Sequence, residues 1–402
     1  MPETQDNGNP LGVAAAPTEA LPLPPPVGPD QLLWIELSRS RIENNVRLVR
    51  DRIGPNVRLM AVVKANAYGH GAATVARWLL NTGADALGVI SIGEARSLRA
   101  AGIRVPIHVL GTIPPGRADE VVRYDLRPVV FDLEFARALE VMGERAGREI
   151  EVTVKVETGM NRHGLEGVRL DEVMAYLAGA RSVKVAGLAT HFARSDEADP
   201  EPTLRQLSRL NAAIGRYRAL GHALPLCHAA NTAATLLYPE THLGMVRCGL
   251  ALYGFHPSEV TRREFRGGAL QPALEFKARI VDLRTVKEGE AVSYGGTWRA
   301  PRPTRIAVLP VGYSDGYRRD LSNKGHVLVR GRRAPILGRV CMNLTMVDVT
   351  GIPGAAKGDV ATLVSGDPAS GATLDDLSRL LGTINYEVVS GLVESIDRLL
   401  VP

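Results

Sequence analysis

Short apolar runs alternate with longer stretches of helical periodicity from Leu32 to about Gly268. In a typical repeat the apolar run RLMAVVK at 58–64 precedes AATVARWLL at 72–80, in which apolar positions recur at helical spacing. This rhythm is typical of βα units that build a parallel sheet. It occurs about eight times, enough to close a (β/α)8 barrel. We predict strands at residues 34–37, 58–64, 86–90, 106–111, 128–131, 150–158, 184–192, 224–230 and 242–249.

After residue 268 the pattern changes to β-branched alternation with glycine turns, as in TRIAVLPVGY at 304–313. One helix-like segment, LDDLSRLLG at 374–382, interrupts it. The predicted fold class is therefore α/β: a (β/α)8 TIM barrel at residues 32–268, followed by a mainly-β C-terminal domain at 269–402. Residues 1–31 are rich in proline and alanine and lack a basic start and an apolar core, so we expect a disordered tail without a secretory signal.

Composition narrows the function classes. The 48 Lys and Arg residues barely exceed the 43 Asp and Glu residues, and the basic positions are scattered, which does not favour nucleic-acid binding. No apolar run approaches the ~18 residues of a membrane helix. The three cysteines, Cys227, Cys248 and Cys341, show neither a metal-binding pair nor a disulfide pattern. We expect a cytoplasmic protein without a metal.

Lys64 stands at the carboxyl end of the predicted strand 58–64, where barrel enzymes assemble their active sites. An apolar strand beside the amine would partly desolvate it and lower its pKa, as a Schiff-base or general-base lysine requires. An isolated lysine more often caps a strand in solvent. Tyr68 and the small residues around it favour the functional interpretation, because they make a loop open enough for a ligand.

Several motifs in order resemble those of the alanine racemases, which are fold-type III pyridoxal-phosphate enzymes. AVVKANAYGHG at 61–71 resembles the cofactor-lysine motif of that family, and the likeness extends over residues 32–388. Ordered motifs that match together are far more specific than one alone. The others are VKVETGMNRHG, THFARSDE, HAANTAAT, VRCGLALYG, VSYGGTW, GYSDGY, GRVCMNLTMVDV and TINYEV.

The resemblance implies pyridoxal 5'-phosphate as cofactor and a homodimer with shared active sites, in which the β domain at 269–402 contributes to the partner's site. Lys64 would hold the cofactor covalently, and Tyr294 would arrive from the partner subunit. These two bases on opposite faces would remove the α-proton and return a proton on the other side, which inverts the α-carbon. Alone, Tyr294 would be interpreted as a packed strand tyrosine.

The resemblance also implies roles around the cofactor. Arg247 would donate to the pyridine nitrogen without leaving a proton on it, which weakens the ring as an electron sink and favours racemisation over transamination or decarboxylation. His191 would lie against the ring. The phosphate would be held by hydroxyl groups and backbone N–H groups. The matching positions are Tyr68, Thr232, Gly249, Leu250 and Tyr386.

Near the substrate, Arg162 matches the arginine that contacts the carboxylate region and the Tyr294 phenol. Lys155 matches a lysine that is carbamylated in some members. Met342 would offer its backbone N–H to the substrate carboxylate, and Tyr313 would line the entrance from the partner chain.

The chain departs from the common family pattern at Asn343, where aspartate is usual, and at His163, where leucine is usual. Loss of a carboxylate near the entrance could widen the choice of substrate. The segment after Tyr386 also differs from the usual one, without an assigned consequence.

The expected function is thus interconversion of L- and D-alanine, which supplies D-alanine for peptidoglycan. A broader amino-acid racemase acting on serine, lysine or arginine is the alternative. A decarboxylase of the same fold should show a cysteine motif in the C-terminal domain and an acidic partner in place of Arg247, and neither is apparent. A non-catalytic cofactor carrier should lack Tyr294 and the whole β domain.

Overall fold

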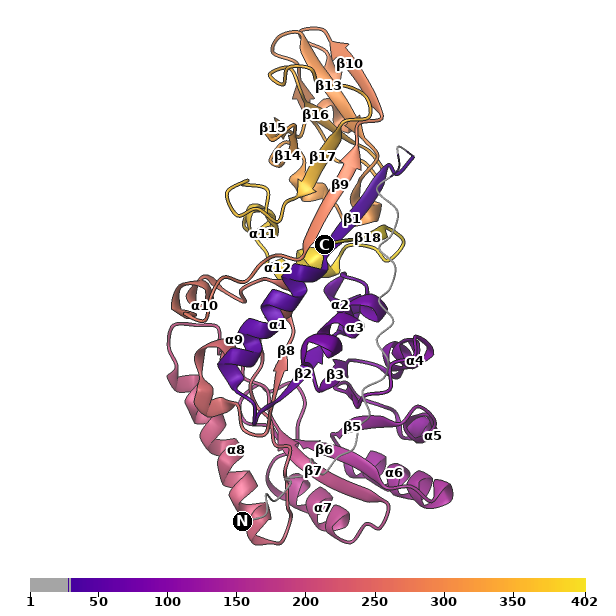
Figure 1. The fold of residues 1–402 in the computed structure, drawn as a ribbon, viewed down its shortest axis with the longest axis vertical. Helices are drawn as coiled ribbons and strands as arrows, with labels where there is room; N and C mark the ends of the chain where they lie inside the picture. Colours follow the sequence, from indigo (N-terminus) through magenta and orange to yellow (C-terminus); the bar gives the residue numbers. More distant parts are fainter. Residues whose placement is uncertain (1–27, 29) are drawn as a thin grey trace, which may run out of the picture.

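The computed structural model describes residues 28 and 30–402, and it has two parts (Figure 1). A barrel-like part surrounded by helices forms the lower half of the view, and an elongated β domain stands above it. The expectation of a disordered tail at 1–31 falls mostly outside the described residues. No helix in the described part of the chain is long and apolar enough to cross a membrane.

The lower part is built on a parallel sheet in the order β7-β6-β5-β4-β3-β2-β8. Its strands are buried on both faces, as expected for a sheet covered by helices outside and packed side chains inside. The strands are β2 (Arg58–Val62), β3 (Ala86–Val89), β4 (Ile107–Val109), β5 (Leu126–Val130), β6 (Ile150–Lys155), β7 (Val183–Ala189) and β8 (Met245–Cys248).

The extended segment 226–230 closes the gap between β7 and β8. On one side the backbone N–H of His228 donates to Leu188 O over 3.1 Å, and Ala189 and His228 form a parallel bridge. On the other side the N–H of Arg247 donates to Ala230 O over 3.0 Å. The strand predicted at 224–230 is therefore present as an irregular segment between β7 and β8. With it, the ring of the (β/α)8 barrel is complete.

Helices cover the outside of the barrel (Figure 1). In α1, Ile42, Val46, Val49 and Ile53 form a buried stripe at helical spacing; Ser38 caps the start and a glycine follows the end. The helices of this part are α1 (Arg39–Ile53), α3 (Ala72–Thr82), α4 (Ile92–Ala100), α5 (Ala118–Arg123), α6 (Leu133–Ala146), α7 (Gly167–Ala178), α8 (Glu201–Ala219), α9 (Thr232–Leu237) and α10 (Glu259–Glu264).

The upper part is a mainly-β domain, as predicted. One sheet has the order β15-β14-β17-β9-β1-β18, in which β1 is Leu33–Ser38; a second has the order β10-β13-β16, and β11 pairs with β12. Two short helices, α11 (Leu374–Leu381) and α12 (Asn385–Ser390), lie where this domain meets the barrel. The strands are β9 (Leu274–Arg279), β10 (Asp282–Val286), β11 (Ala291–Val292), β12 (Trp298–Arg299), β13 (Thr304–Leu309), β14 (His326–Val329), β15 (Arg332–Pro335), β16 (Thr345–Asp348), β17 (Val360–Val364) and β18 (Asp397–Val401).

The strand β1 (Leu33–Ser38) corrects one prediction. Its apolar run was predicted as the first repeat of the barrel, but it pairs antiparallel with β9 and parallel with β18 in the upper domain. The Arg279 guanidinium lies 5.4 Å from the Trp34 ring, and Lys277 pairs with Glu36 over 2.5 Å. A short apolar run predicts a buried strand but carries no information about its neighbours, so the sequence pattern could not assign its sheet.

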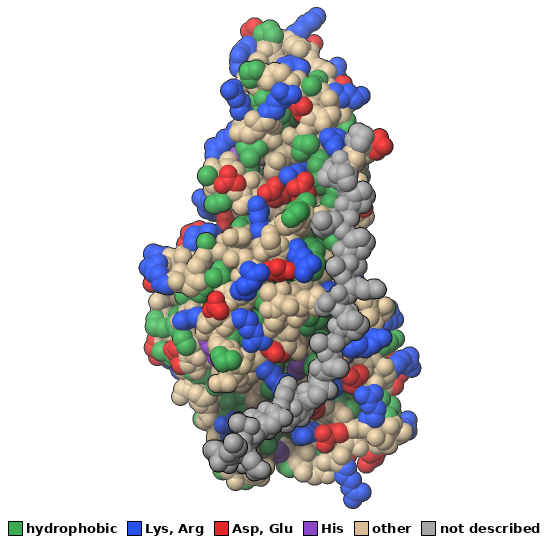
Figure 2. Space-filling view, in the orientation of Figure 1, with side chains coloured by type: hydrophobic (Ala, Val, Ile, Leu, Met, Phe, Trp, Pro, Cys, Tyr) green, Lys and Arg blue, Asp and Glu red, His purple; other side chains and the backbone are tan. Residues whose placement is uncertain are grey.

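The surface carries charges of both signs. Figure 2 shows Lys and Arg side chains interspersed with Asp and Glu side chains over both parts on the face in view. Many of them form exposed ion pairs, such as Arg205 with Glu201 and Arg123 with Asp119. Such pairs add little to stability, typically below about 1 kcal/mol each.

Candidate active site

A cavity of about 890 Å³ opens at the carboxyl ends of the barrel strands, where barrel enzymes place their active sites. Most of the residues that the sequence singled out line it. They are Lys64, Tyr68, Lys155, Arg162, His191, Thr232, Arg247, Gly249 and Tyr386. His163, one of the two departures from the family pattern, also lines it, and its ring lies 5.3 Å from that of Phe131. Leu250 follows Gly249 and is fully buried behind the cavity wall.

Lys64 lies two residues after the end of β2 and lines this cavity. Burial lowers the pKa of its amine, and the positive charges of Arg162 and Arg247 lower it further, whereas Glu94 raises it. A larger fraction of the amine is therefore neutral at neutral pH than for an exposed lysine. A neutral amine is the form that attacks a carbonyl group or accepts a proton.

The segment α2 (Lys64–Tyr68) turns in the left-handed sense, which the sequence did not predict. Ala65, Asn66, Ala67 and Tyr68 all have φ values between 51° and 53°. The left-handed conformation costs L-residues roughly 1–2 kcal/mol each, so the surroundings must hold this turn. At its start the N–H of Ala65 donates to Glu94 Oε1 over 2.8 Å. The side chain of Asn66, a residue type that tolerates this conformation, accepts from the N–H of Ala72 over 2.7 Å.

Arg247 is buried and held by four acceptors. Its Nη1 donates to His228 Nδ1 over 2.7 Å, and Nη2 donates to His191 Nδ1 over 3.1 Å and to the carbonyl oxygens of Thr190 and Ala229, each over 2.9 Å. Burial lowers its pKa to about 10, so the guanidinium is still charged at neutral pH. Among the described residues, Nε has no partner and remains available to a ligand in the cavity.

Two further groups next to Arg247 have lowered pKa values. Burial lowers the pKa of His191 well below its usual value, and the nearby charge of Arg247 lowers it further. Burial, Arg247 and Arg162 lower the pKa of the Lys155 amine, while Glu157 raises it. The charge of Arg247 thus acts on the pKa of both neighbouring side chains.

Hydroxyl groups gather in another part of the cavity wall. The N–H of Gly249 donates to Thr232 Oγ1 over 3.0 Å, which leaves the hydroxyl proton of Thr232 free to donate. A Cβ at position 249 would lie 2.7 Å from the Tyr68 hydroxyl, so glycine is needed for this close approach. The Tyr386 ring lies 6.0 Å from that of Tyr68. Burial raises the pKa of both tyrosines, so both remain protonated donors.

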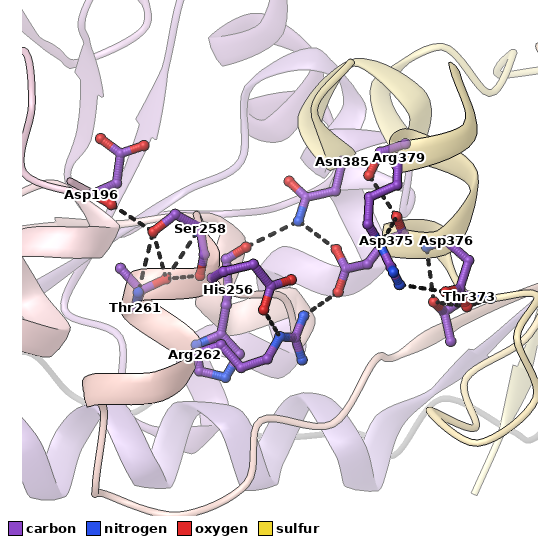
Figure 3. Close-up of polar contacts among 12 residues, drawn as sticks. Asp196, His256, Ser258, Thr261, Arg262, Thr373, Asp375, Asp376, Arg379 and Asn385 are labelled. Carbon is purple, nitrogen blue, oxygen red and sulfur yellow. Dashed lines mark hydrogen bonds and ion pairs between the residues drawn. The ribbon is translucent and has the colours of Figure 1, made fainter. Parts of the chain in front are cut away.

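Tyr386 reaches the cavity because α12 is tied to the barrel by a chain of polar contacts (Figure 3). The side-chain amide of Asn385 donates to Asp375 Oδ1 over 2.8 Å and to the backbone oxygen of His256 over 3.0 Å. Asp375 in turn pairs with Arg262 of α10. These contacts join both domains directly beside Tyr386, and no sequence motif indicated them.

Three predicted site residues lie away from this cavity. Tyr294, Tyr313 and Met342 belong to the β domain, do not line the cavity, and are 72%, 42% and 54% exposed. Two of them lie on paired backbone segments: the N–H of Tyr313 donates to Cys341 O and the N–H of Ser314 donates to Met342 O, each over 3.1 Å. One chain therefore carries two separate sets of predicted site residues.

Comparison with known proteins decides the family. The N-terminal domain model of alanine racemase matches residues 37–257, and the C-terminal domain model matches residues 273–400. The chain belongs to the alanine racemase family. It is 40% identical over 372 residues to the alanine racemase of Desulfovibrio desulfuricans, covering 92% of this chain and 99% of that protein.

Solved alanine racemase structures have the same fold. That of Streptomyces lavendulae has a TM-score of 0.87 at 34% identity and covers 92% of this chain and 97% of its own. That of Bacillus anthracis, with bound L-Ala-P, has a TM-score of 0.87 at 31% identity and covers 92% and 95%. These relatives confirm the predicted fold, a barrel with a C-terminal β domain. They also confirm the predicted enzyme class, an isomerase of the alanine racemase family. They favour neither the broader racemase nor the decarboxylase or carrier alternatives.

Proposed function

We propose that this protein interconverts L-alanine and D-alanine with pyridoxal 5'-phosphate, in active sites that two copies of the chain build together. The observation that carries this proposal is the separation of the two predicted bases. Lys64 lines the barrel cavity, whereas Tyr294 is 72% exposed on the β domain and outside that cavity. A second chain that brings its Tyr294 to this cavity would complete the pair.

The residues of the cavity fit pyridoxal phosphate. A neutral amine at Lys64 suits covalent attachment of an aldehyde, and the hydroxyl groups of Thr232, Tyr68 and Tyr386 with the backbone at 249–250 suit a phosphate. Arg247, whose Nε has no described partner, would donate to the pyridine nitrogen, and His191 would lie against the ring. When bound, this cofactor withdraws electrons from the substrate α-carbon and makes its proton acidic.

The chain's own residues would move the protons. Of Lys64 and the partner's Tyr294, the one that is deprotonated, as amine or phenolate, takes the α-proton, and the other, which is protonated, delivers its proton to the opposite face; the roles exchange in the reverse direction. Arg162 would orient the substrate carboxylate and stabilise the Tyr294 phenolate. Met342 would add its backbone N–H, and Tyr313 would line the entrance. The depressed pKa of the Lys155 amine suits carbamylation, which also requires a neutral amine.

We also propose a cytoplasmic role in supplying D-alanine for peptidoglycan. Alanine racemisation is the reaction that makes this D-amino acid from the common L-form. The three cysteines are free, in keeping with a reducing compartment.

Mixed dimers test the proposal. Lys64→Ala and Tyr294→Phe chains should each be inactive alone. After dissociation and reassociation at equal amounts, half of the dimers are mixed, and each mixed dimer has one site with an intact Lys64 and an intact Tyr294. We expect recovery of about one quarter of wild-type activity toward L-alanine. No recovery, although mass spectrometry shows mixed dimers, would contradict the shared site. A wild-type chain that converts serine, lysine or arginine as well as alanine would favour the broader racemase.

A further inference from the structure

The left-handed turn that carries Lys64 and Tyr68 is held at its C-terminal end by Arg398, a residue more than 300 positions away in the sequence. Arg398 lies on β18, the last strand of the upper domain. Its Nε and Nη2 both donate to the backbone oxygen of Gly69, over 3.2 Å and 3.0 Å. The same guanidinium donates through Nη1 to the backbone oxygens of Val393 and Glu394, each over 2.8 Å, and to that of Ile396.

Arg398 thus connects two backbone segments that have no direct strand pairing. One is the turn at 64–69; the other is the loop at 393–396 that leads into β18. Because a planar guanidinium presents its donors in a fixed fork, it sets the distance and orientation between both segments. Lysine, a single point of charge on a flexible stem, cannot reach both sets of oxygens in the same way.

The end of α12, just before the loop at 393–396, packs tightly against the turn. A Cβ at Gly69 would lie 2.4 Å from the backbone oxygen of Val389, at the end of α12. Gly69 itself has φ = 77° and is the C-terminal cap of the turn. The turn is therefore enclosed between Glu94 at its start and the 389–398 segment at its end.

We propose that Arg398 is a positioning residue, which keeps the left-handed turn in place and thereby fixes Lys64 and Tyr68 toward the cavity. It touches neither the cavity nor a reacting atom. The turn has an unfavourable backbone conformation at four consecutive non-glycine residues, so it relaxes when its restraints are removed. The inference rests on the proposed function only for the role of Lys64; the restraint itself concerns the backbone.

Hydrogen exchange on the full chain, loaded and then stripped of cofactor, separates positioning from general stability. Arg398→Lys keeps the charge, and Arg398→Ala removes all six hydrogen bonds of the guanidinium. Arg279→Ala is the matched control, because Arg279 also ties backbone oxygens together in the same sheet, those of Gln31, Gly358 and Gly28, without contacting the turn. We expect amides in 64–71 to exchange about tenfold faster in Arg398→Lys and faster still in Arg398→Ala, with no change there in Arg279→Ala.

A second readout is the rate at which the loaded protein loses its cofactor absorbance, which should rise in both Arg398 variants. Exchange in 64–71 at the wild-type rate in Arg398→Lys would overturn the proposal. So would faster exchange confined to β1 and β18, or an equal effect in Arg279→Ala. If Arg398→Ala does not fold, the lysine variant decides. A chain that binds no pyridoxal phosphate would refute the proposed function, while exchange in 64–71 would still test the restraint.

Discussion

Arg247 donates through Nη1 to Nδ1 of His228 over 2.7 Å, and this contact fixes the tautomer of a buried histidine. A guanidinium has no acceptor, so Nδ1 of His228 must be unprotonated and its proton must be on Nε2. Burial, together with the charge of Arg247, lowers the pKa of His228 well below its usual value and keeps it neutral. The cation that we assign to the cofactor ring is therefore itself held by a barrel histidine.

Replacing Arg247 with lysine should destabilise the protein even without cofactor. The ammonium keeps the charge but cannot satisfy four acceptors arranged around a planar fork. We expect the free energy of unfolding of the stripped protein to fall by about 2–4 kcal/mol in urea titrations. Arg205→Lys, in an exposed ion pair with Glu201, should change it by less than about 0.5 kcal/mol. Equal effects of both variants would contradict this account of Arg247.

Removing the Tyr294 hydroxyl should lower kcat strongly without loss of cofactor. A lost acid/base group typically lowers kcat by about 10²- to 10⁴-fold, and Tyr294→Phe keeps the ring and its packing. Cofactor content is checked by absorbance, and racemisation by loss of optical rotation from L-alanine. Tyr176→Phe, on α7 at the outside of the barrel, is the control and should keep wild-type kcat. Unchanged kcat in Tyr294→Phe would refute the two-base mechanism.

Acid should weaken the fold through buried histidines. Burial lowers the pKa of His70 to about 4 and that of His108 to about 3, from 6.5. Between each native pKa and the unfolded value of 6.5, the unfolded chain binds more protons than the native one. The stability contributed by the neutral histidines is therefore complete above pH 6.5 and is lost as pH falls. For each histidine, the free energy of unfolding should fall by about 2 kcal/mol between pH 6.5 and pH 5. Urea titrations of His108→Gln should show a shallower decline, whereas a decline equal to wild type would contradict the assignment.

Two glycines with similar backbone angles should respond differently to a methyl group. Gly69 and Gly382 have φ values of 77° and 67°, but a Cβ meets the Val389 oxygen at 2.4 Å in the first case and open space in the second. Gly382→Ala should cost about 1 kcal/mol of stability for the conformation alone. We expect Gly69→Ala to cost about 3 kcal/mol or more and to weaken cofactor binding. Equal losses in thermal unfolding would show that the contact with Val389 yields easily.

The polar link beside Tyr386 should matter for cofactor affinity. Asn385→Ala removes the donor to Asp375 and to the backbone at His256, so α12 loses this polar link to the barrel. We expect the Kd for pyridoxal phosphate to rise about tenfold, measured by titration of the stripped protein. Arg379→Ala, which breaks an exposed pair with Asp376 in the neighbouring helix, is the control. A wild-type Kd in Asn385→Ala would show that the phosphate site is held by other contacts.

The sequence by itself determined the barrel rhythm, the change to a β domain and the cavity residues near strand ends. Lys64 could be found because β2 is an unbroken apolar run, and the carboxyl ends of parallel strands meet at one face of a barrel. The resemblance to alanine racemase motifs added Arg247 and Thr232, and both line the same cavity.

Only the tertiary structure decided which distant segments meet. It moved β1 from the barrel to the upper sheet, because strand pairing is a long-range choice that a local apolar pattern does not encode. It revealed the left-handed turn at 65–68, a conformation that alanine does not prefer and that only surrounding contacts hold. It also placed Tyr294 outside the cavity that contains Lys64, because the position of a side chain depends on how whole domains pack.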